Sequence, residues 1–161
     1  MQMIKSRLEA YLKDKKKIIL IALILILLIG TDQCIKAIVV KNFVDPVGIH
    51  LIKVNLQINT GMALGLNEGN TRNIFITILI LILIINFAIT QRERIDKKTG
   101  ISLCFIVAGG VSNLIDRFIY KGVVDYIDAI GFPIFNLADV YIVFGWLLLI
   151  MSVYKYTTKK E

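Results

Sequence analysis

Five aspartates lie at or near the ends of long apolar runs in this sequence: Asp32, Asp116, Asp125, Asp128 and Asp139. A charged side chain at the centre of a membrane-spanning helix costs about 2.5 to 3.5 kcal/mol, and less near the interface. Two carboxylates held close together in a partly desolvated site share one proton. The ionised member can then activate a water while the protonated member polarises an amide carbonyl. The aspartates are therefore candidates for hydrolysis that needs no metal.

Each aspartate also has a purely structural explanation. Asp139 follows Asn136 by three residues, a spacing at which the two side chains can cap the start of a helix. Asp116 stands next to an arginine and could simply neutralise it. Asp128 could be a solvated loop charge, and Asp32 could anchor a helix at the membrane interface. The residue types alone leave these explanations open.

Other catalytic sets are scarce. His50 is the single histidine, so a Ser-His-Asp triad would have to use it, and no HExxH spacing is present for zinc. Ser112 has only Lys121 as a possible partner at the same end of the chain's apolar runs. Cys34 and Cys104 lie in apolar segments without a CxxC spacing, which favours packing over a disulfide or a metal site. The remaining chemistry is that of carboxylates.

The composition indicates that these aspartates belong to one small membrane domain. Of the 161 residues, 57% are hydrophobic, and the mean hydropathy is +0.73. The apolar residues form long runs, which is the pattern selected by hydrocarbon. The net charge of +7 is compatible with nucleic acid, but basic blocks also flank membrane helices. Their position beside the apolar runs favours the membrane.

The long apolar runs predict four transmembrane helices in an all-α membrane protein. The first includes the apolar residues 18–30 and continues through residues 35–40, although Asp32 and Lys36 interrupt the apolar pattern. Residues 73–90, 101–115 and 132–154 form the others. After the first helix, Val54, Leu56 and Ile58 alternate with polar residues, and a period of two indicates a half-buried strand. A small extracytoplasmic β-rich segment is therefore expected after the first helix, resting on the membrane surface.

The distribution of basic residues predicts the orientation. Of the 19 lysines and arginines, thirteen fall in residues 1–17, 91–100 and 155–161, and six fall in the rest of the chain. The positive-inside rule then places both termini in the cytoplasm and residues 41–72 and 117–131 outside. The expected organisation is a basic amphipathic cytoplasmic tail (1–17), a single four-helix membrane domain (18–154) and a basic cytoplasmic tail (155–161).

Five short motifs occur in order at the expected helix ends. They are Asp32-Gln33 with Lys36, Asn59-Thr60-Gly61 followed by Ala63, Gly109-Gly110 continuing through Asn113-Leu114-Ile115-Asp116-Arg117, Val123-Val124-Asp125-Tyr126-Ile127, and Phe135-Asn136-Leu137-Ala138-Asp139. They resemble the D-Q-x-x-K, N-x-G-A-A, G-G-x-x-G-N-L-x-D-R, V-V-D-F-I and F-N-[LI]-A-D segments of the lipoprotein signal peptidases, also called signal peptidase II. The resemblance covers nearly the whole chain after the basic tail. Met62, Leu64 and Ser112 depart from the family pattern.

The resemblance implies a catalytic pair, Asp125 and Asp139, with Asp116 as the chief rival of Asp125. It implies supporting or substrate-binding roles for nine further residues: Asp32, Lys36, Asn59, Gly61, Asn113, Asp116, Arg117, Asn136 and Ala138. Apart from the resemblance, Gly109 and Gly110 are small enough to let their helix approach a neighbour closely, and Asn113, one turn on, can then hydrogen-bond across that contact.

The implied function is that of a membrane aspartic endopeptidase. Such an enzyme removes the signal peptide from diacylglyceryl-modified prolipoproteins by cutting before the lipidated cysteine. It would need no cofactor or metal, would contact membrane lipid but no nucleic acid, and would act as a monomer in the bacterial cytoplasmic membrane. A proton-coupled transporter and a non-enzymatic assembly subunit are the alternatives. The first is disfavoured by acids that gather at one face of the membrane, and the second leaves the clustered acids unexplained.

Overall fold

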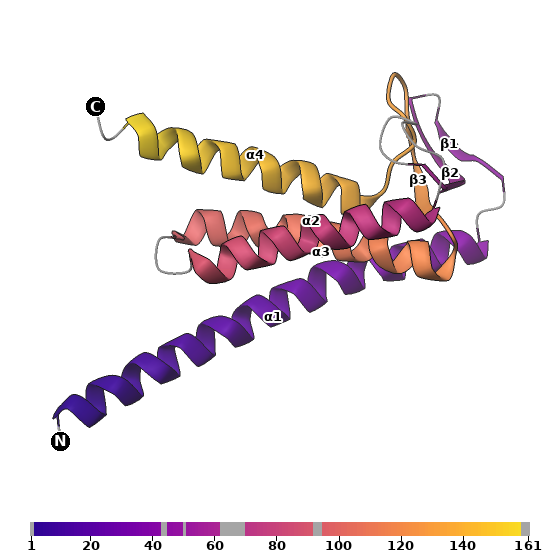
Figure 1. Ribbon diagram of the computed structural model, residues 1–161. Helices are drawn as coiled ribbons and strands as arrows, with labels where there is room; N and C mark the ends of the chain where they lie inside the picture. The colour runs from indigo at the N-terminus through magenta and orange to yellow at the C-terminus, as the bar shows by residue number, and fades with distance from the viewer. Residues whose placement is uncertain (1, 43–44, 50, 62–69, 92–94, 159–161) are drawn as a thin grey trace.

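The computed structural model describes residues 2–42, 45–49, 51–61, 70–91 and 95–158. Its elements in chain order are α1 (Gln2–Asn42), β1 (Val47–Ile49), β2 (Ile52–Asn59), α2 (Asn70–Thr90), α3 (Lys97–Ile119), β3 (Val123–Ala129) and α4 (Leu137–Thr158). The helices converge at the end where the strands gather, whereas α1 and α4 diverge toward the other end, at which both termini lie (Figure 1). The site residues predicted from the sequence belong to the end that carries the sheet.

The helices are apolar on their outer surfaces, as membrane helices are. Within the described chain, α1 from Lys15, α2 and α3 are long and apolar enough to cross a membrane, whereas the apolar part of α4, Leu137–Ser152, is shorter. Only Asn73 and Leu81 of α2 are buried. A mostly helical membrane protein with a small sheet is therefore confirmed, and the count of four spans stays a prediction. Helix α1 continues unbroken past Asp32 and Lys36, the charges that interrupt its apolar pattern, as expected of a single first helix.

Helix α3 forms the centre of the molecule, because it packs against α1, α2 and α4. A Cβ atom at Gly109 would collide with the backbone carbonyl of Ala138 in α4, and one at Gly110 would press on Leu81 in α2. Without side chains, the two glycines let both neighbouring helices approach α3 closely. The expected role of this glycine pair is confirmed, with one glycine facing each neighbour.

The sheet is antiparallel, with the strand order β1-β2-β3. The sequence predicted the strand that is now β2, but it gave no sign of β3, which crosses between α3 and α4 and carries Asp125. The register of β2 against β3 shifts between Val54 and Gln57. Asn59 is half-buried while Ile58 is exposed, so the apolar positions of β2 are not simply the inner ones.

Candidate active site

The site is built around three fully buried charges. The Nζ atom of Lys36 lies 2.7 Å from a carboxylate oxygen of Asp32 in the same helix and 2.7 Å from one of Asp116 in α3, and all three residues are at most 1% exposed. The same ammonium donates a hydrogen bond to Oδ1 of Asn113, 3.0 Å away. Buried charges persist in proteins when they are paired and hydrogen-bonded, as these are. We call Asp32, Lys36 and Asp116 the charge cluster.

The two acids of the charge cluster also hold the backbone on either side of the site. Asp32 Oδ1 accepts a hydrogen bond from the backbone N–H of Ala138 at 2.9 Å, and Asp116 Oδ2 accepts one from the N–H of Val124 at 3.1 Å. Ala138 immediately precedes Asp139, and Val124 immediately precedes Asp125. The charge cluster thus fixes the main chain one residue before each of the two aspartates proposed for catalysis.

Asp125 is buried in β3, where two neutral amides donate to it. Asn136 Nδ2 lies 2.6 Å from its Oδ1, and Asn59 Nδ2 lies 2.9 Å from its Oδ2. Burial raises the pKa of Asp125 from 3.8 to about 6; the nearby charge of Asp139 adds to the rise, and the two amide hydrogen bonds act against it. Asp125 can therefore keep a proton at a pH at which an exposed aspartate is fully ionised.

Asp139 lies in the first turn of α4, and it is tied to the same asparagine. Its backbone N–H donates to Asn136 Oδ1 at 2.9 Å, and its Oδ2 accepts from the backbone N–H of Asn136 at 3.2 Å. This reciprocal pair caps the start of the helix, as the spacing of the two residues predicted, and the side chain of Asp139 uses only one of its oxygens for it. Its other oxygen, Oδ1, remains turned toward Asn113, whose Nδ2 lies 2.8 Å away.

Asn136 brings the two aspartates together because the backbone before it pairs with β3. The carbonyl of Phe135 accepts from the N–H groups of Tyr126 and Ile127, and the N–H of Phe135 donates to the carbonyl of Ile127. This pairing sets Asn136 beside Asp125 at the point where α4 begins. A single side chain therefore contacts one carboxylate directly and caps the helix that carries the other.

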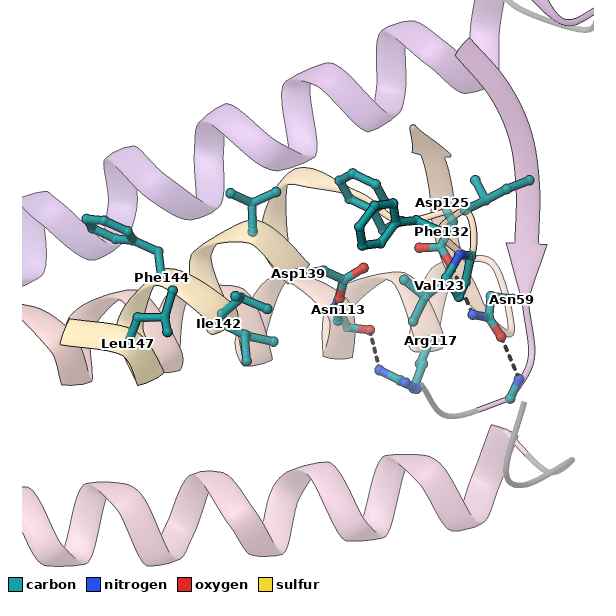
Figure 2. Close-up of a pocket in the computed structure, with 16 residues that line it drawn as sticks. Asn59, Asn113, Arg117, Val123, Asp125, Phe132, Asp139, Ile142, Phe144 and Leu147 are labelled. Atoms are coloured by element: carbon teal, nitrogen blue, oxygen red, sulfur yellow. Dashed lines mark hydrogen bonds between the residues drawn. The ribbon is translucent and has the colours of Figure 1, made fainter. Parts of the chain in front are cut away.

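Both carboxylates line one cavity of about 680 Å³. Asn59, Gly61, Asn113 and Arg117 line its polar end, and an apolar wall of α4 residues continues from it; Figure 2 shows Ile142, Phe144 and Leu147 along this wall. Arg117 donates to the backbone carbonyl of Asn113 at 3.2 Å and lies close enough to Asp125 and Asp139 to interact with their charges. The arrangement offers two carboxylates, a cation and an apolar surface to one bound molecule.

Several residues singled out from the sequence do not line this cavity. The charge cluster and Ala138 are buried and do not line it, and the ion pair of Asp116 is with Lys36. Asp128 accepts a hydrogen bond from Asn55 at 3.0 Å and does not line the cavity either. His50, Met62 and Leu64 lie outside the described residues.

Two further contributors were not among the predicted site residues. Gln33 donates through Nε2 to Asp116 Oδ1 at 2.8 Å and to Ser112 Oγ at 3.0 Å, and Ser112 Oγ donates to Asp32 Oδ2 at 2.6 Å. Their position in sequence was the available signal, because each lies within a predicted motif. Ser112, where the family pattern has glycine, thus adds one more donor to the charge cluster.

Comparison with known proteins identifies this architecture. The family model described as signal peptidase (SPase) II matches residues 24–155. A lipoprotein signal peptidase of Clostridioides difficile is 33% identical over 145 residues, which cover 86% of this chain and 97% of that protein. A lipoprotein signal peptidase of Caldicellulosiruptor bescii is 39% identical over 127 residues, which cover 77% and 83%.

Solved structures agree with the sequence matches. A bacterial membrane enzyme superposes with a TM-score of 0.80 at 31% identity, covering 88% of this chain and 91% of that one. A second bacterial membrane enzyme gives a TM-score of 0.74 at 30% identity, covering 83% and 91%. The fold and the matches together define a membrane-integral protease. The chain belongs to the signal peptidase II family, and the resemblance found in the sequence is confirmed.

The charge cluster predicts the effect of replacing its lysine. Lys36→Met leaves Asp32 and Asp116 buried without their counter-ion, which should lower the free energy of unfolding by about 3 to 5 kcal/mol. Lys41→Met, at an exposed position of the same helix, should change it by less than about 0.5 kcal/mol. Thermal unfolding of the purified variants in detergent measures both. Equal melting temperatures for the two variants would show that the cluster is not needed for stability.

The environment of Asp125 predicts its titration. Infrared difference spectra should show a protonated carboxyl group that loses its proton as the pH rises through about 6, since burial holds the pKa of Asp125 there. The carboxyl is protonated below this pH and ionised above it. The signal should be absent from Asp125→Asn and retained in Asp128→Asn. A transition near the ordinary aspartate value of about 4 would contradict this assignment.

Proposed function

We propose that this chain cleaves its substrates with Asp125 and Asp139 as the catalytic pair of an aspartic endopeptidase. Its activity, as a member of the signal peptidase II family, is the removal of signal peptides from prolipoproteins. The observation that carries the aspartic mechanism is that both carboxylates line the same cavity while Asn136 hydrogen-bonds to both residues.

The chemistry follows from one proton shared by the pair. The ionised carboxylate accepts a proton from water as the water oxygen bonds to the scissile carbonyl carbon, and the protonated carboxyl donates its proton to the carbonyl oxygen. The tetrahedral intermediate then collapses, the C–N bond breaks, and the amine leaves with a proton from the carboxyl that had received the water's proton. The proton on the carbonyl oxygen returns to the other carboxylate, so the pair again holds one proton. The raised pKa of Asp125 supports this scheme, because a carboxyl must remain protonated near neutral pH.

Three asparagines orient the pair. Asn59 and Asn136 donate to Asp125, and Asn113 donates to Asp139. The Asn113 amide is itself oriented, since its oxygen accepts hydrogen bonds from Lys36 and Asn136. In this proposal, four buried residues that do not line the cavity hold the main chain near the pair and do not touch substrate: Asp32, Lys36, Asp116 and Ala138. Arg117 and Gly61, which line the cavity, contact the substrate backbone.

The apolar wall of α4 supports a lipid-modified substrate. Val143, Phe144 and Leu147 are largely exposed and continue from the carboxylates along the helix. Each methylene buried in hydrocarbon contributes about 0.8 kcal/mol, so a diacylglyceryl group lying in the bilayer would hold its cysteine at a fixed depth. The bond before this cysteine would then lie at the level of the pair, which makes the reaction effectively intramolecular.

The remaining expectations from the sequence form part of the same proposal. Residues 18–154 are one four-helix domain with α4 as the fourth span, flanked by the basic tails 1–17 and 155–161, and the chain works as a monomer in contact with lipid. It lies in the bacterial cytoplasmic membrane with both termini inside and the site at the outer face. Both termini lie at the end of the helices opposite the sheet, which supports placing the termini on one side of the membrane and the site on the other (Figure 1).

The first prediction from this mechanism concerns the pair itself. Asp125→Asn and Asp139→Asn should each lower turnover of a lipidated precursor to background, because neither variant can share and exchange a proton. Asp128→Asn should keep turnover within about threefold of the parent, since Asp128 lies away from the cavity. EDTA should leave the parent unaffected. Substantial turnover by either pair variant in its folded form, or inactivation by EDTA, would reject the aspartic mechanism.

The second prediction concerns the substrate. One prolipoprotein precursor, offered with and without a diacylglyceryl group on its cysteine, should be cleaved at least about a hundredfold faster in the lipidated form because the lipid fixes the depth of the bond. Cleavage is followed in detergent micelles by the change in precursor mass. Equal rates for the two forms would reject selection by the lipid.

The third prediction concerns orientation. In a background with Cys34→Ser and Cys104→Ser, Lys53→Cys in β2 should react with an impermeant thiol reagent added outside intact cells, and Lys97→Cys at the start of α3 should not. Both positions are exposed in the structure, so accessibility across the membrane decides the result. Labelling of position 97 with protection of position 53 would reverse the proposed topology.

A further inference from the structure

Helix α2 presents almost no buried side chains to the rest of the protein, and one of the two it does bury is polar. Asn73 is 0% exposed and lies in the first turns of α2, whose described surface is otherwise mostly apolar. Buried asparagines in membrane helices commonly bond to a neighbouring element. Asn73 Nδ2 donates to the backbone carbonyl of Thr60 at 3.1 Å, in the segment that follows β2.

The Thr60 carbonyl belongs to the same planar peptide unit as the N–H of Gly61. This N–H donates to Asn59 Oδ1 at 3.0 Å, and the other end of the same amide, Nδ2, donates to Asp125 Oδ2 at 2.9 Å. Holding the carbonyl therefore fixes the direction of the N–H on the opposite side of the peptide. That direction decides which end of the Asn59 amide points at the carboxylate. Figure 2 shows the two hydrogen bonds that join Gly61, Asn59 and Asp125.

We propose that Asn73 is a positioning residue for the reaction, which acts through the Thr60–Gly61 peptide and Asn59 to orient Asp125. This inference rests on the proposed role of Asp125. Asn59 is the last residue of β2 in the ladder with β3, where it pairs with Val123, so the ladder fixes its backbone but not the peptide beyond it. Asn73, in helix α2, holds this peptide through its hydrogen bond to the Thr60 carbonyl.

A second contact on the same face of α2 supports the assignment. Asn70, three residues before Asn73, donates through Nδ2 to the backbone carbonyl of Arg117 at 3.0 Å. Residues three apart lie on one face of a helix. The start of α2 thus bonds to the main chain at two points bordering the cavity, near Arg117 and near Asn59.

The test is a double-mutant cycle between Asn73 and Asn59. Asn73→Leu keeps the branched skeleton of the side chain but replaces its amide oxygen and nitrogen by methyl groups, which removes the donor. It should lower kcat by roughly tenfold to a hundredfold, with a smaller change in KM. Asn59→Ala should lower kcat by a similar factor. Because one residue acts through the other, the double variant should be no slower than Asn59→Ala alone. Asn86→Leu, an exposed asparagine on the same helix, is the matched control and should keep the parental kcat.

A purely structural role for Asn73 predicts different results. It would lower the melting temperature and leave kcat of the folded fraction unchanged, which would overturn the proposal. Losses in kcat that multiply in the double variant would also overturn it. A second readout is the carboxyl titration, which Asn73→Leu should shift to higher pH, because the hydrogen bond from Asn59 normally lowers the pKa of Asp125. An unshifted titration would also overturn it.

Two further variants keep the test decisive. If Asn73→Leu does not fold, Asn73→Gln retains an amide donor on a side chain one methylene longer, and it should recover part of kcat and obey the same cycle with Asn59→Ala. Asp125→Asn distinguishes a failure of the proposed function from a failure of the positioning role of Asn73. Activity in Asp125→Asn would reject the proposed function, whereas an inactive Asp125→Asn with multiplying losses for Asn73 and Asn59 would reject the positioning role alone.

Discussion

The ion pairs of Lys36 with Asp32 and Asp116 are the interaction on which the rest of the site depends. Three charges with essentially no exposed surface are tolerated inside an apolar bundle only because each neutralises or hydrogen-bonds the others. Through the two acids, the cluster holds the N–H groups of Ala138 and Val124, and so it determines where α4 begins and where β3 passes α3. Moving any one of these charges would displace the main chain before the two aspartates proposed for catalysis.

The same cluster explains how a pair of carboxylates can share a proton close to a lysine. Lys36 is paired with Asp32 and Asp116 and hydrogen-bonds to neither Asp125 nor Asp139; its charge lowers the pKa of Asp125 less than the hydrogen bonds from Asn59 and Asn136 do. The side-chain donor to Asp139 is the neutral amide of Asn113. The direct side-chain hydrogen bonds to Asp125 also come from neutral amides. Neutral donors orient a carboxylate without the full stabilisation of its ionised form that an adjacent cation would give. Burial can then keep the pKa of Asp125 near 6, where proton exchange is possible at moderate pH.

The geometry of the cavity links this chemistry to the membrane. Its polar end lies where the sheet meets the helices, and its apolar wall follows α4. A substrate with a lipid anchor would satisfy both parts at once, with hydrocarbon against the helix and the amide bond beside the pair. The close approach of α3 and α4 at Gly109 keeps Asn113 and the start of α4 within hydrogen-bonding distance of each other, so packing within the bundle controls the contact between Asn113 and Asp139.

The sequence by itself determined the membrane class, the helical segments, one strand and the residues from which the site is made. Lipid demands long apolar runs, which makes helices visible in the sequence, and the cost of charge in an apolar setting makes each aspartate conspicuous. Only the tertiary structure decided that Asp125 and Asp139 line a cavity while Asp116 pairs with Lys36, because these contacts join residues as far apart as Asp32 and Ala138. It also decided the strand β3 and the contact of Asn73 with Thr60, since a short strand and a single buried amide have no periodic signal and acquire their roles from partners on other elements.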